Sequence, residues 1–175
     1  MFSKCCIKIV VLFFLIISSF SISYADKIPI NSMLEVELKL PEIKTGMYAR
    51  PYVAIWVEDE NHQPIKTLQL WVGKDDWLKD LRSWWRKIGR YDRDRVDAVT
   101  SATRPAGKYH FLWDGINDNG EKIEQGTYTL YVEVVREHGG RDFFGQNLEL
   151  DESSFSQVLK AKHEIGKIKI DYKVE

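Results

Sequence analysis

Alternation of apolar and polar residues along several short segments is the feature that most constrains the fold of this chain. Between residues 33 and 40, apolar side chains at every second position alternate with Glu35, Glu37 and Lys39. A period of two places the two sets on opposite faces of an extended strand. Residues 127–137 alternate in the same way. Further strands are expected at residues 51–57, 65–72, 109–113, 143–150 and 165–174.

About seven short strands separated by turns predict a mainly β fold, an antiparallel Ig-like β-sandwich. The polar turn at residues 58–64 predicts that the strands on its two sides form a β-hairpin.

The period changes after residue 74. Large apolar residues, among them Trp77, Trp84 and Trp85, recur at helical spacing until Gly89, a helix-stop residue. This pattern predicts one amphipathic helix of about three to four turns, with the tryptophans in the core rather than in a ligand site. Residues 90–107 follow neither period, so we interpret them as one long functional loop.

The first 25 residues have the order of a secretory signal peptide. Lys4 and Lys8 form a short basic region, an almost wholly apolar run follows, and Ser23 and Ala25 provide small residues at a cleavage site. We predict cleavage after Ala25 and a periplasmic location, with an uncleaved N-terminal anchor as the alternative. Residues 26–175 are then expected to form one domain that does not span the membrane.

Composition excludes several classes of function. Cys5 and Cys6 are the only cysteines and precede the predicted cleavage site, so the mature domain has no disulfide. Losing Lys4 and Lys8 leaves 23 basic and 26 acidic residues, a net charge of −3, which disfavours a nucleic-acid binder. The histidines and the turn at residues 114–120 lack the spacing of metal sites, and no hydrolase triad or phosphate-binding loop occurs. No catalytic residue and no metal ligand is predicted.

Turn residues in the second half of the chain support the sandwich prediction. The segments Trp113-Asp114-Gly115, Asp118-Asn119-Gly120 and Gln125-Gly126-Thr127-Tyr128 follow one another in this order. Together they resemble the WDG…NG…GTY signature of the Ig-like domain in flagellar-hook capping proteins. The Asn-Gly pair and Gly126 suit positive φ angles, so we expect a β-hairpin here, after which Tyr128 returns to the core.

A wider resemblance covers the chain from about residue 34 to residue 171. The segments that carry it are RPYVAIW (50–56), WLKDL (77–81), WW (84–85), DAVTSATRP (97–105) and REHGG (136–140). In this order they resemble a family of predicted periplasmic proteins described as a domain of unknown function. Its members are associated with flavin transferases and with membrane proteins bearing PepSY domains. The resemblance implies a flavin transferase and a PepSY-type membrane redox protein as partners.

The stretch DAVTSAT within this resemblance carries the predicted chemistry. It is similar to the D-x-x-[S/T]-G-A-[S/T] motif of FMN-binding domains in sodium-pumping quinone reductases. In those domains a flavin transferase joins FMN to the last Ser or Thr through a phosphoester. The resemblance implies Thr103 as acceptor, Asp97 and Thr100 as recognition positions and Ala102 as a small neighbour. Ser101 replaces the glycine of the motif, which removes a residue suited to a positive-φ turn.

Two residues outside the motif complete the predicted cofactor site. Arg104 is a candidate partner for the flavin phosphate, with a solvated loop cation as the alternative. His138 is a candidate for lining the site or relaying protons, with an inert turn residue as the alternative. A threonine hydroxyl is a weak nucleophile, so the base and the metal must come from the transferase. The acceptor must therefore lie on an accessible loop.

These observations favour a periplasmic electron-transfer protein that carries FMN covalently attached to Thr103, a flavin-bearing carrier more than a turnover enzyme. The alternative is a cofactor-free Ig-like binding or assembly module of the periplasm, because such sandwiches serve many functions. A flavin-dependent reductase is a third interpretation, which the lack of an acid–base constellation disfavours.

Overall fold

The computed structural model describes residues 26–46 and 48–175, and the predicted signal peptide lies outside them. Nine strands occur in this part of the chain. They are β1 (Met33–Leu40), β2 (Tyr52–Glu58), β3 (Pro64–Trp71), β4 (Thr100–Ser101), β5 (Gly107–Trp113), β6 (Gly126–Val135), β7 (Arg141–Leu150), β8 (Phe155–Leu159) and β9 (Ile168–Lys173).

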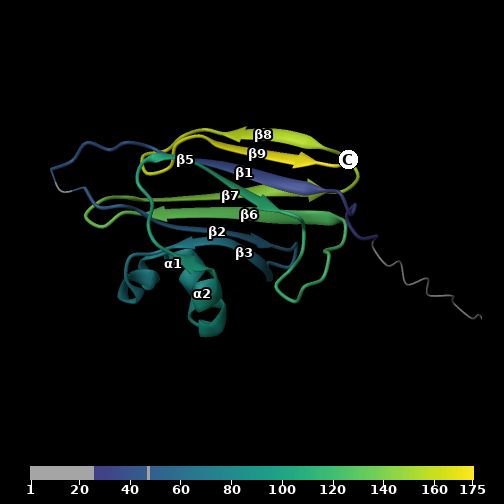
Figure 1. The fold of residues 1–175 in the computed structure, drawn as a ribbon, viewed down its shortest axis with the longest axis horizontal. Helices are drawn as coiled ribbons and strands as arrows, with labels where there is room; N and C mark the ends of the chain where they lie inside the picture. The colour runs from purple at the N-terminus through teal and green to yellow at the C-terminus, as the bar shows by residue number, and fades with distance from the viewer. Residues whose placement is uncertain (1–25, 47) are drawn as a thin grey trace, which may run out of the picture.

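The strands form two sheets that lie face to face (Figure 1). One sheet has the order β5-β1-β9-β8 and the other the order β4-β3-β2-β6-β7. Pairing is antiparallel between these strands except for β3 with β4, which is parallel. The predicted antiparallel β-sandwich is therefore confirmed.

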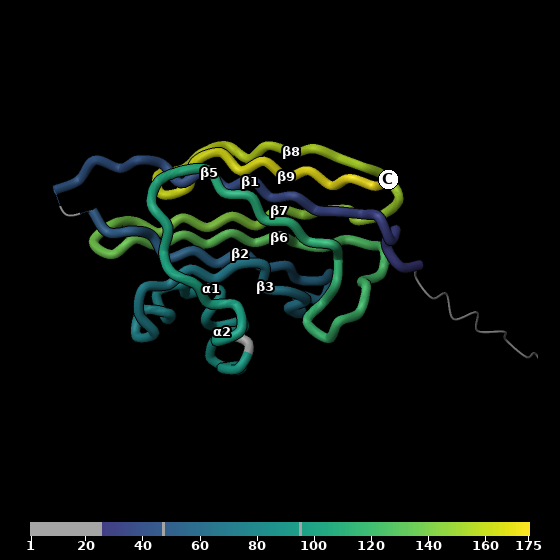
Figure 2. The backbone as a smooth tube through the Cα atoms, viewed as in Figure 1, coloured from purple at the N-terminus to yellow at the C-terminus, as the bar shows by residue number. Residues whose placement is uncertain are grey.

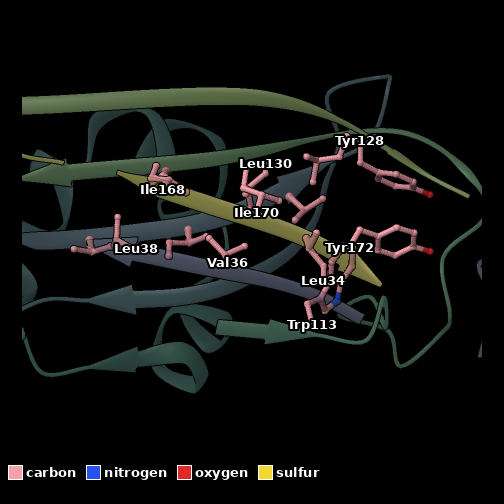
Figure 3. Close-up of a cluster of buried hydrophobic side chains, with 14 of the residues drawn as sticks. Leu34, Val36, Leu38, Trp113, Tyr128, Leu130, Ile168, Ile170 and Tyr172 are labelled. Atoms are coloured by element: carbon pink, nitrogen blue, oxygen red, sulfur yellow. The ribbon is translucent and has the colours of Figure 1, made fainter. Parts of the chain in front are cut away.

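The main core fills the space between the sheets (Figure 3). Leu34, Val36 and Leu38 of β1 are buried there, and Ile168 and Ile170 of β9 lie beside them. The polar residues that alternate with them on β1 face outward. Glu35 and Glu37 are partly exposed and Lys39 is exposed. The period of two in the sequence therefore reports which face of each strand is buried.

One predicted hairpin is confirmed, and the other forms only as a short turn in which Ile116 and Lys122 make an isolated antiparallel bridge. β2 and β3 pair across the polar turn at residues 58–64. β5 and β6 do not pair, because β5 lies beside β1 in the four-stranded sheet and β6 beside β2 in the other. The segment between them crosses from one sheet to the other, at the end of the sandwich where the C-terminus lies (Figure 2). Tyr128 is buried, as predicted, and Gly120 and Gly126 have positive φ.

Gly115 determines the path of this crossing. Its φ is +76°, and a Cβ there would lie 2.2 Å from Ile28 Cδ1. We expect Gly115→Ala to lower the free energy of unfolding by about 2–3 kcal/mol, through backbone strain and displacement of the buried Ile28. Gly120→Ala is the matched control, because its φ is +82° but no atom lies within 4 Å of the added Cβ. Urea unfolding followed by circular dichroism compares the two, and equal losses would show that contact with Ile28 is unimportant.

A helical layer between β3 and β4 covers the outer face of the five-stranded sheet (Figure 1). It consists of a 3₁₀ segment η1 (Asp75–Asp80), a short helix α1 (Arg82–Trp84), a π-helical turn η2 (Trp85–Gly89) and a helix α2 (Arg93–Val99). The prediction of one continuous helix over residues 77–88 is wrong, because the backbone leaves the helical region at Leu81, with φ −73° and ψ 68°. The prediction that residues 90–107 lack regular structure is also wrong.

Glu133 of β6 explains why the helix restarts after Leu81. Its side chain is fully buried and accepts hydrogen bonds from the backbone N–H groups of Ser83 (3.1 Å) and Trp84 (3.0 Å). Arg141 Nε donates to the same carboxylate at 2.6 Å. A buried carboxylate requires such donors, and the first N–H groups of a helix are free to supply them. The contact with Glu133 therefore determines where the helix begins, although the helical spacing of apolar residues starts earlier, at Trp77.

A second core lies between the helical layer and the sheet. Trp84 is fully buried in it, and Trp85 packs against its side while remaining half-buried. Both positions agree with the predicted core role. Trp77 contradicts that prediction, because 37% of its surface is exposed. Its place in the 3₁₀ segment η1, rather than in a continuous helix, turns it away from the sheet.

Candidate functional site

The predicted acceptor motif spans a helix, a strand and an irregular segment. Asp97 is exposed on α2. Thr100 and Ser101 form β4, which pairs with Leu70 and Trp71 at the edge of the five-stranded sheet. Residues 102–106 then run to β5 in the other sheet, along one side of the sandwich (Figure 2). The accessible segment expected around the acceptor is therefore only about five residues long.

The three hydroxyl groups of the motif have different environments. Thr100 Oγ1 donates to the Val96 carbonyl at 2.6 Å. Ser101 Oγ accepts from Gln69 Nε2 at 2.9 Å and lies 3.4 Å from the Leu70 carbonyl oxygen. Thr103 Oγ1 makes no hydrogen bond to any residue in 26–46 or 48–175, and the residue is only half-buried. Of the three, only the Thr103 hydroxyl is both accessible and uncommitted.

Ser101 is not strained in place of the glycine of the motif. Among the described non-glycine residues, only His62 and His138 have positive φ. Ser101 instead has the extended backbone of a strand residue opposite Trp71. A glycine is therefore not required at this position for the chain to fold.

The segment that follows Thr103 is held against the sandwich. The Arg104 guanidinium lies 5.9 Å from the centre of the Trp71 ring, within the range of a cation–π contact. Tyr109 packs edge-on against the same ring at 4.8 Å and donates its hydroxyl to the Pro105 carbonyl at 2.7 Å. Arg104 forms no ion pair with a described carboxylate, so its charge is available beside Thr103.

His138 is not brought together with Thr103. It occupies the turn after β6 with φ +54°, and its nearest charged partner is Glu137 at 3.7 Å. Thr103 follows β4, and β3 and β2 lie between β4 and β6 in the sheet. The register aligns Ser101 and Val134 at the same end of the sheet, so the two residues lie at one end of it, separated by β3 and β2, and the role of His138 stays a prediction.

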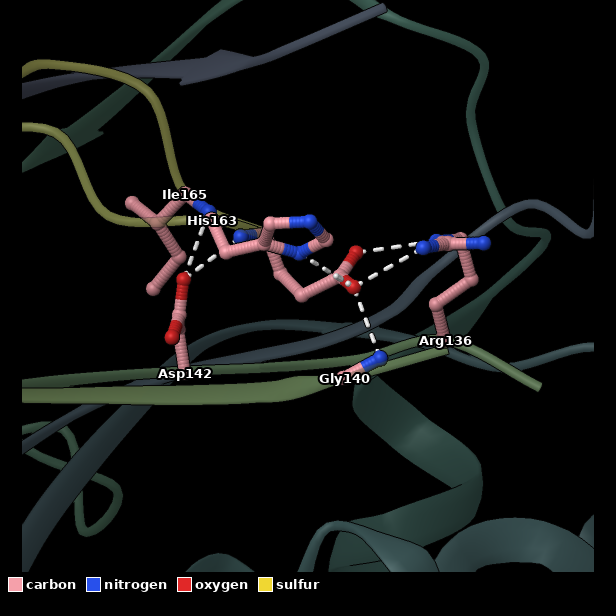
Figure 4. A network of polar contacts seen from close by, with 6 residues as sticks. Arg136, Gly140, Asp142, His163 and Ile165 are labelled. Atoms are coloured by element: carbon pink, nitrogen blue, oxygen red, sulfur yellow. Dashed lines mark hydrogen bonds and ion pairs between the residues drawn. The ribbon is translucent and has the colours of Figure 1, made fainter. Parts of the chain in front are cut away.

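A buried ion pair, which sequence reasoning missed, accounts for much of the REHGG segment (Figure 4). Arg136 donates through Nε and Nη2 to the two Glu164 carboxylate oxygens, both at 2.9 Å. The Gly140 N–H and the His163 ring nitrogen also contact this carboxylate, at 2.7 and 3.0 Å. A Cβ on Gly139 would lie 2.5 Å from Arg136 Cζ, so a glycine is needed where the turn passes the guanidinium. These residues have a structural role.

The electrostatics of Glu164 follow from the same contacts. Burial alone raises the pKa of this carboxyl group, but hydrogen bonds from Arg136, the Gly140 N–H and His163 outweigh burial. The pKa is therefore held below its ordinary value of 4.5, and Glu164 is ionised at neutral pH. No sequence pattern marked it, because it lies in a polar stretch without periodicity.

Comparison with known families identifies the chain. A family model described as "Predicted periplasmic protein (DUF2271)" matches residues 33–167. The match runs from the first residue of β1 to the residue before β9, and so includes the five-stranded sheet, the helical layer and every strand of the other sheet except β9. The chain belongs to the DUF2271 family. No match was found among curated proteins or among solved structures.

The residues around Thr103 in this DUF2271 protein fit the attachment of a phosphorylated cofactor. The hydroxyl is free, the preceding Ala102 is small and exposed, and the cation of Arg104 follows directly. A phosphodiester carries a negative charge that such a cation favours.

The described residues were also compared with the requirements of a membrane-spanning helix and of a metal site. Within residues 26–46 and 48–175, no helix combines the length and apolar character needed to cross a membrane. In the same part of the chain, no three His, Asp or Glu side chains gather closely enough to hold a metal ion.

Proposed function

We propose that this DUF2271 protein is a periplasmic electron carrier with FMN covalently attached to Thr103 by a flavin transferase. The observation that carries the proposal is the Thr103 hydroxyl, which is accessible and has no hydrogen-bond partner among the described residues. Thr100 and Ser101 offer the same functional group, but both hydroxyls are engaged with the backbone or with Gln69. The motif and the local geometry thus favour the same acceptor.

The attachment step balances with FAD as the donor. Thr103 Oγ1 forms a phosphoester bond to the FMN phosphorus, the pyrophosphate bond of FAD breaks, and AMP leaves. The hydroxyl proton passes to a base of the transferase, which also supplies the metal. Ala102 leaves room for the enzyme beside the acceptor, and Arg104 lies where it can neutralise the remaining phosphate charge.

The bound flavin would supply one-electron and two-electron redox chemistry. Covalent attachment suits a periplasmic protein. A flavin that dissociates there is lost by dilution, whereas a covalent bond retains the flavin whatever its binding affinity. We assign the protein a carrier role between other redox proteins. A PepSY-type membrane protein is the partner that we propose.

Substitution of Thr103 and of one neighbouring hydroxyl residue tests the proposal. We expect Thr103→Ala to abolish covalent flavin, Thr103→Ser to retain it, and Ser101→Ala, at a position where the motif has no hydroxyl group, to retain most of it. Each variant is produced with an active flavin transferase, denatured, and separated on a gel, where covalent flavin is detected by fluorescence. Retention of flavin by Thr103→Ala would overturn the assignment. A wild-type protein without flavin beside an active transferase would instead favour the cofactor-free binding module.

A further inference from the structure

A cavity lies on the outer face of the five-stranded sheet, away from Thr103. Its volume is about 350 Å³, which is within the usual range for small-molecule sites. Residues of β2, β6 and β7 form its floor, and the segment from α1 to η2 forms its rim. Thr103 follows β4 at the other edge of this sheet. The cavity is therefore distinct from the proposed flavin site.

Three aromatic rings form the floor of the cavity. The Trp56 and Tyr131 rings are stacked, with centroids 5.0 Å apart and planes inclined by 22°. Tyr131 and Phe143 are stacked in the same way at 5.5 Å. A Cβ on Gly145 would lie 2.8 Å from the Tyr131 ring, so the ring lies directly over this glycine. Tyr131 and Phe143 remain half-buried, with the Arg141 guanidinium 5.5 Å from the centre of the Phe143 ring, and present an aromatic surface on which a flat ring can stack.

Glu58 adds an acceptor at one side of this floor. Only 4% of the residue is exposed, and its Oε1 accepts from Trp56 Nε1 at 2.9 Å. Its Oε2 lies 3.7 Å from Lys87 Nζ and 4.0 Å from His62 Nδ1, distances longer than hydrogen bonds. These are ion pairs, and the second oxygen accepts no hydrogen bond among the described residues, so in the cavity wall it can accept one from a ligand.

Arg86 supplies a cation at the rim. It is exposed, and its Nε donates to the Arg82 carbonyl at 3.1 Å. Arg86 has no ion pair with a carboxylate in the described residues. A neighbouring hollow shares Arg86 and adds Lys79 and Arg82, so the rim is positively charged. An unpaired arginine beside an aromatic floor favours a ligand with an acidic group.

We propose that this cavity binds a planar aromatic acid whose ring carries a hydroxyl or amino group. The ring stacks on Tyr131 and Phe143, the hydroxyl or amino group donates to Glu58, and the acidic group pairs with Arg86. Each part of the ligand thus has one protein partner of matching chemistry. The proposal does not depend on flavin attachment, because none of these residues belongs to the Thr103 segment.

Three related probes test this site on protein purified after export from cells without a flavin transferase. They are 6-hydroxy-2-naphthoate, 2-naphthoate without the hydroxyl group, and 2-naphthol without the carboxylate. Isothermal titration should show saturable one-to-one binding of 6-hydroxy-2-naphthoate. Removing either polar group is expected to weaken binding about tenfold, as expected for the loss of one hydrogen bond to a charged group. Absence of saturable binding at millimolar concentrations of the first probe would overturn the proposal.

Variants assign each group of the ligand to its partner. Arg86→Gln should abolish the preference for 6-hydroxy-2-naphthoate over 2-naphthol, and Glu58→Gln should reduce its preference over 2-naphthoate. Lys108→Gln, a cation of β5 in the other sheet, should change neither preference. If Glu58→Gln does not fold, Phe143→Ala takes its place and should weaken all three probes. Binding would not be at this cavity if Arg86→Gln left the preference for 6-hydroxy-2-naphthoate over 2-naphthol unchanged. The same would follow if Lys108→Gln reduced that preference as much as Arg86→Gln does.

Discussion

Replacing Trp84 with alanine is expected to lower the free energy of unfolding by about 3–5 kcal/mol. The indole is fully buried between the helical layer and the sheet, and its Nε1 donates to Thr67 Oγ1 at 3.2 Å. The substitution leaves a cavity and deprives the buried Thr67 hydroxyl of a partner. Urea unfolding followed by circular dichroism measures the loss.

Trp77→Ala is the matched control for this experiment. It removes the same side chain from the same helical layer, but 37% of Trp77 is exposed. The expected loss is about 1 kcal/mol or less. Similar losses for the two variants would contradict the packing described for the helical layer.

Removing the Glu164 carboxylate is expected to have an effect of the same size. Glu164→Gln should lower the free energy of unfolding by about 3–5 kcal/mol, because Arg136 then keeps a buried charge without its partner. Glu124→Gln is the control, since Glu124 forms only an exposed pair with Lys27 at 3.7 Å. That pair is expected to contribute about 1 kcal/mol or less. Equal losses of unfolding free energy in Glu164→Gln and Glu124→Gln would show that burial of the Arg136–Glu164 pair is unimportant.

The contribution of Glu164 is also expected to depend on pH. Its pKa in the folded protein is below 4.5, so the folded state binds its proton less readily than the unfolded chain. The stabilisation is therefore fully present above about pH 4.5 and is lost as the pH falls through the lower, folded-state pKa. The difference in unfolding free energy between wild type and Glu164→Gln should shrink between pH 6 and pH 3.5, roughly. A constant difference over this range would contradict the ionised pair.

The sandwich could be predicted because most core strands bury one face, although β2 is buried on both. β1 and β6 showed this most clearly, since one face of each packs against the opposite sheet. β8 was missed for the same reason. Its residues at the edge of the four-stranded sheet are half-buried or exposed, so no apolar alternation marks it, and its strand conformation depends on pairing with β9.

The helical layer shows where local patterns fail. The spacing from Trp77 to Ile88 is that of one helix, but Glu133 is 49 residues from Trp84 in sequence and determines where the helix restarts. The sequence around Trp84 alone cannot predict a contact with a residue so far away in the chain. The prediction that residues 90–107 are irregular failed because, among the described side chains of α2, Val96 is buried and Val99 packs beside it, and two residues do not produce a recognisable helical period.

The candidate flavin site could be predicted only in part. The sequence motif placed the acceptor at Thr103, but Thr100 and Ser101 carry equivalent hydroxyl groups. Contacts with Val96 and Gln69, which only the folded chain brings about, distinguish these two from Thr103. His138 was grouped with the site from the sequence alone, and β3 and β2 lie between its strand and β4, so its role stays a prediction.

The intact mass of the purified protein, produced with and without a co-exported flavin transferase, tests the central claim most directly. Attachment of FMN predicts a mass increase of one FMN less one water, present only with the transferase and located on the peptide that contains Thr103. An unchanged mass, with the transferase active on a control substrate in the same cells, would contradict the assignment of this protein as a flavin carrier.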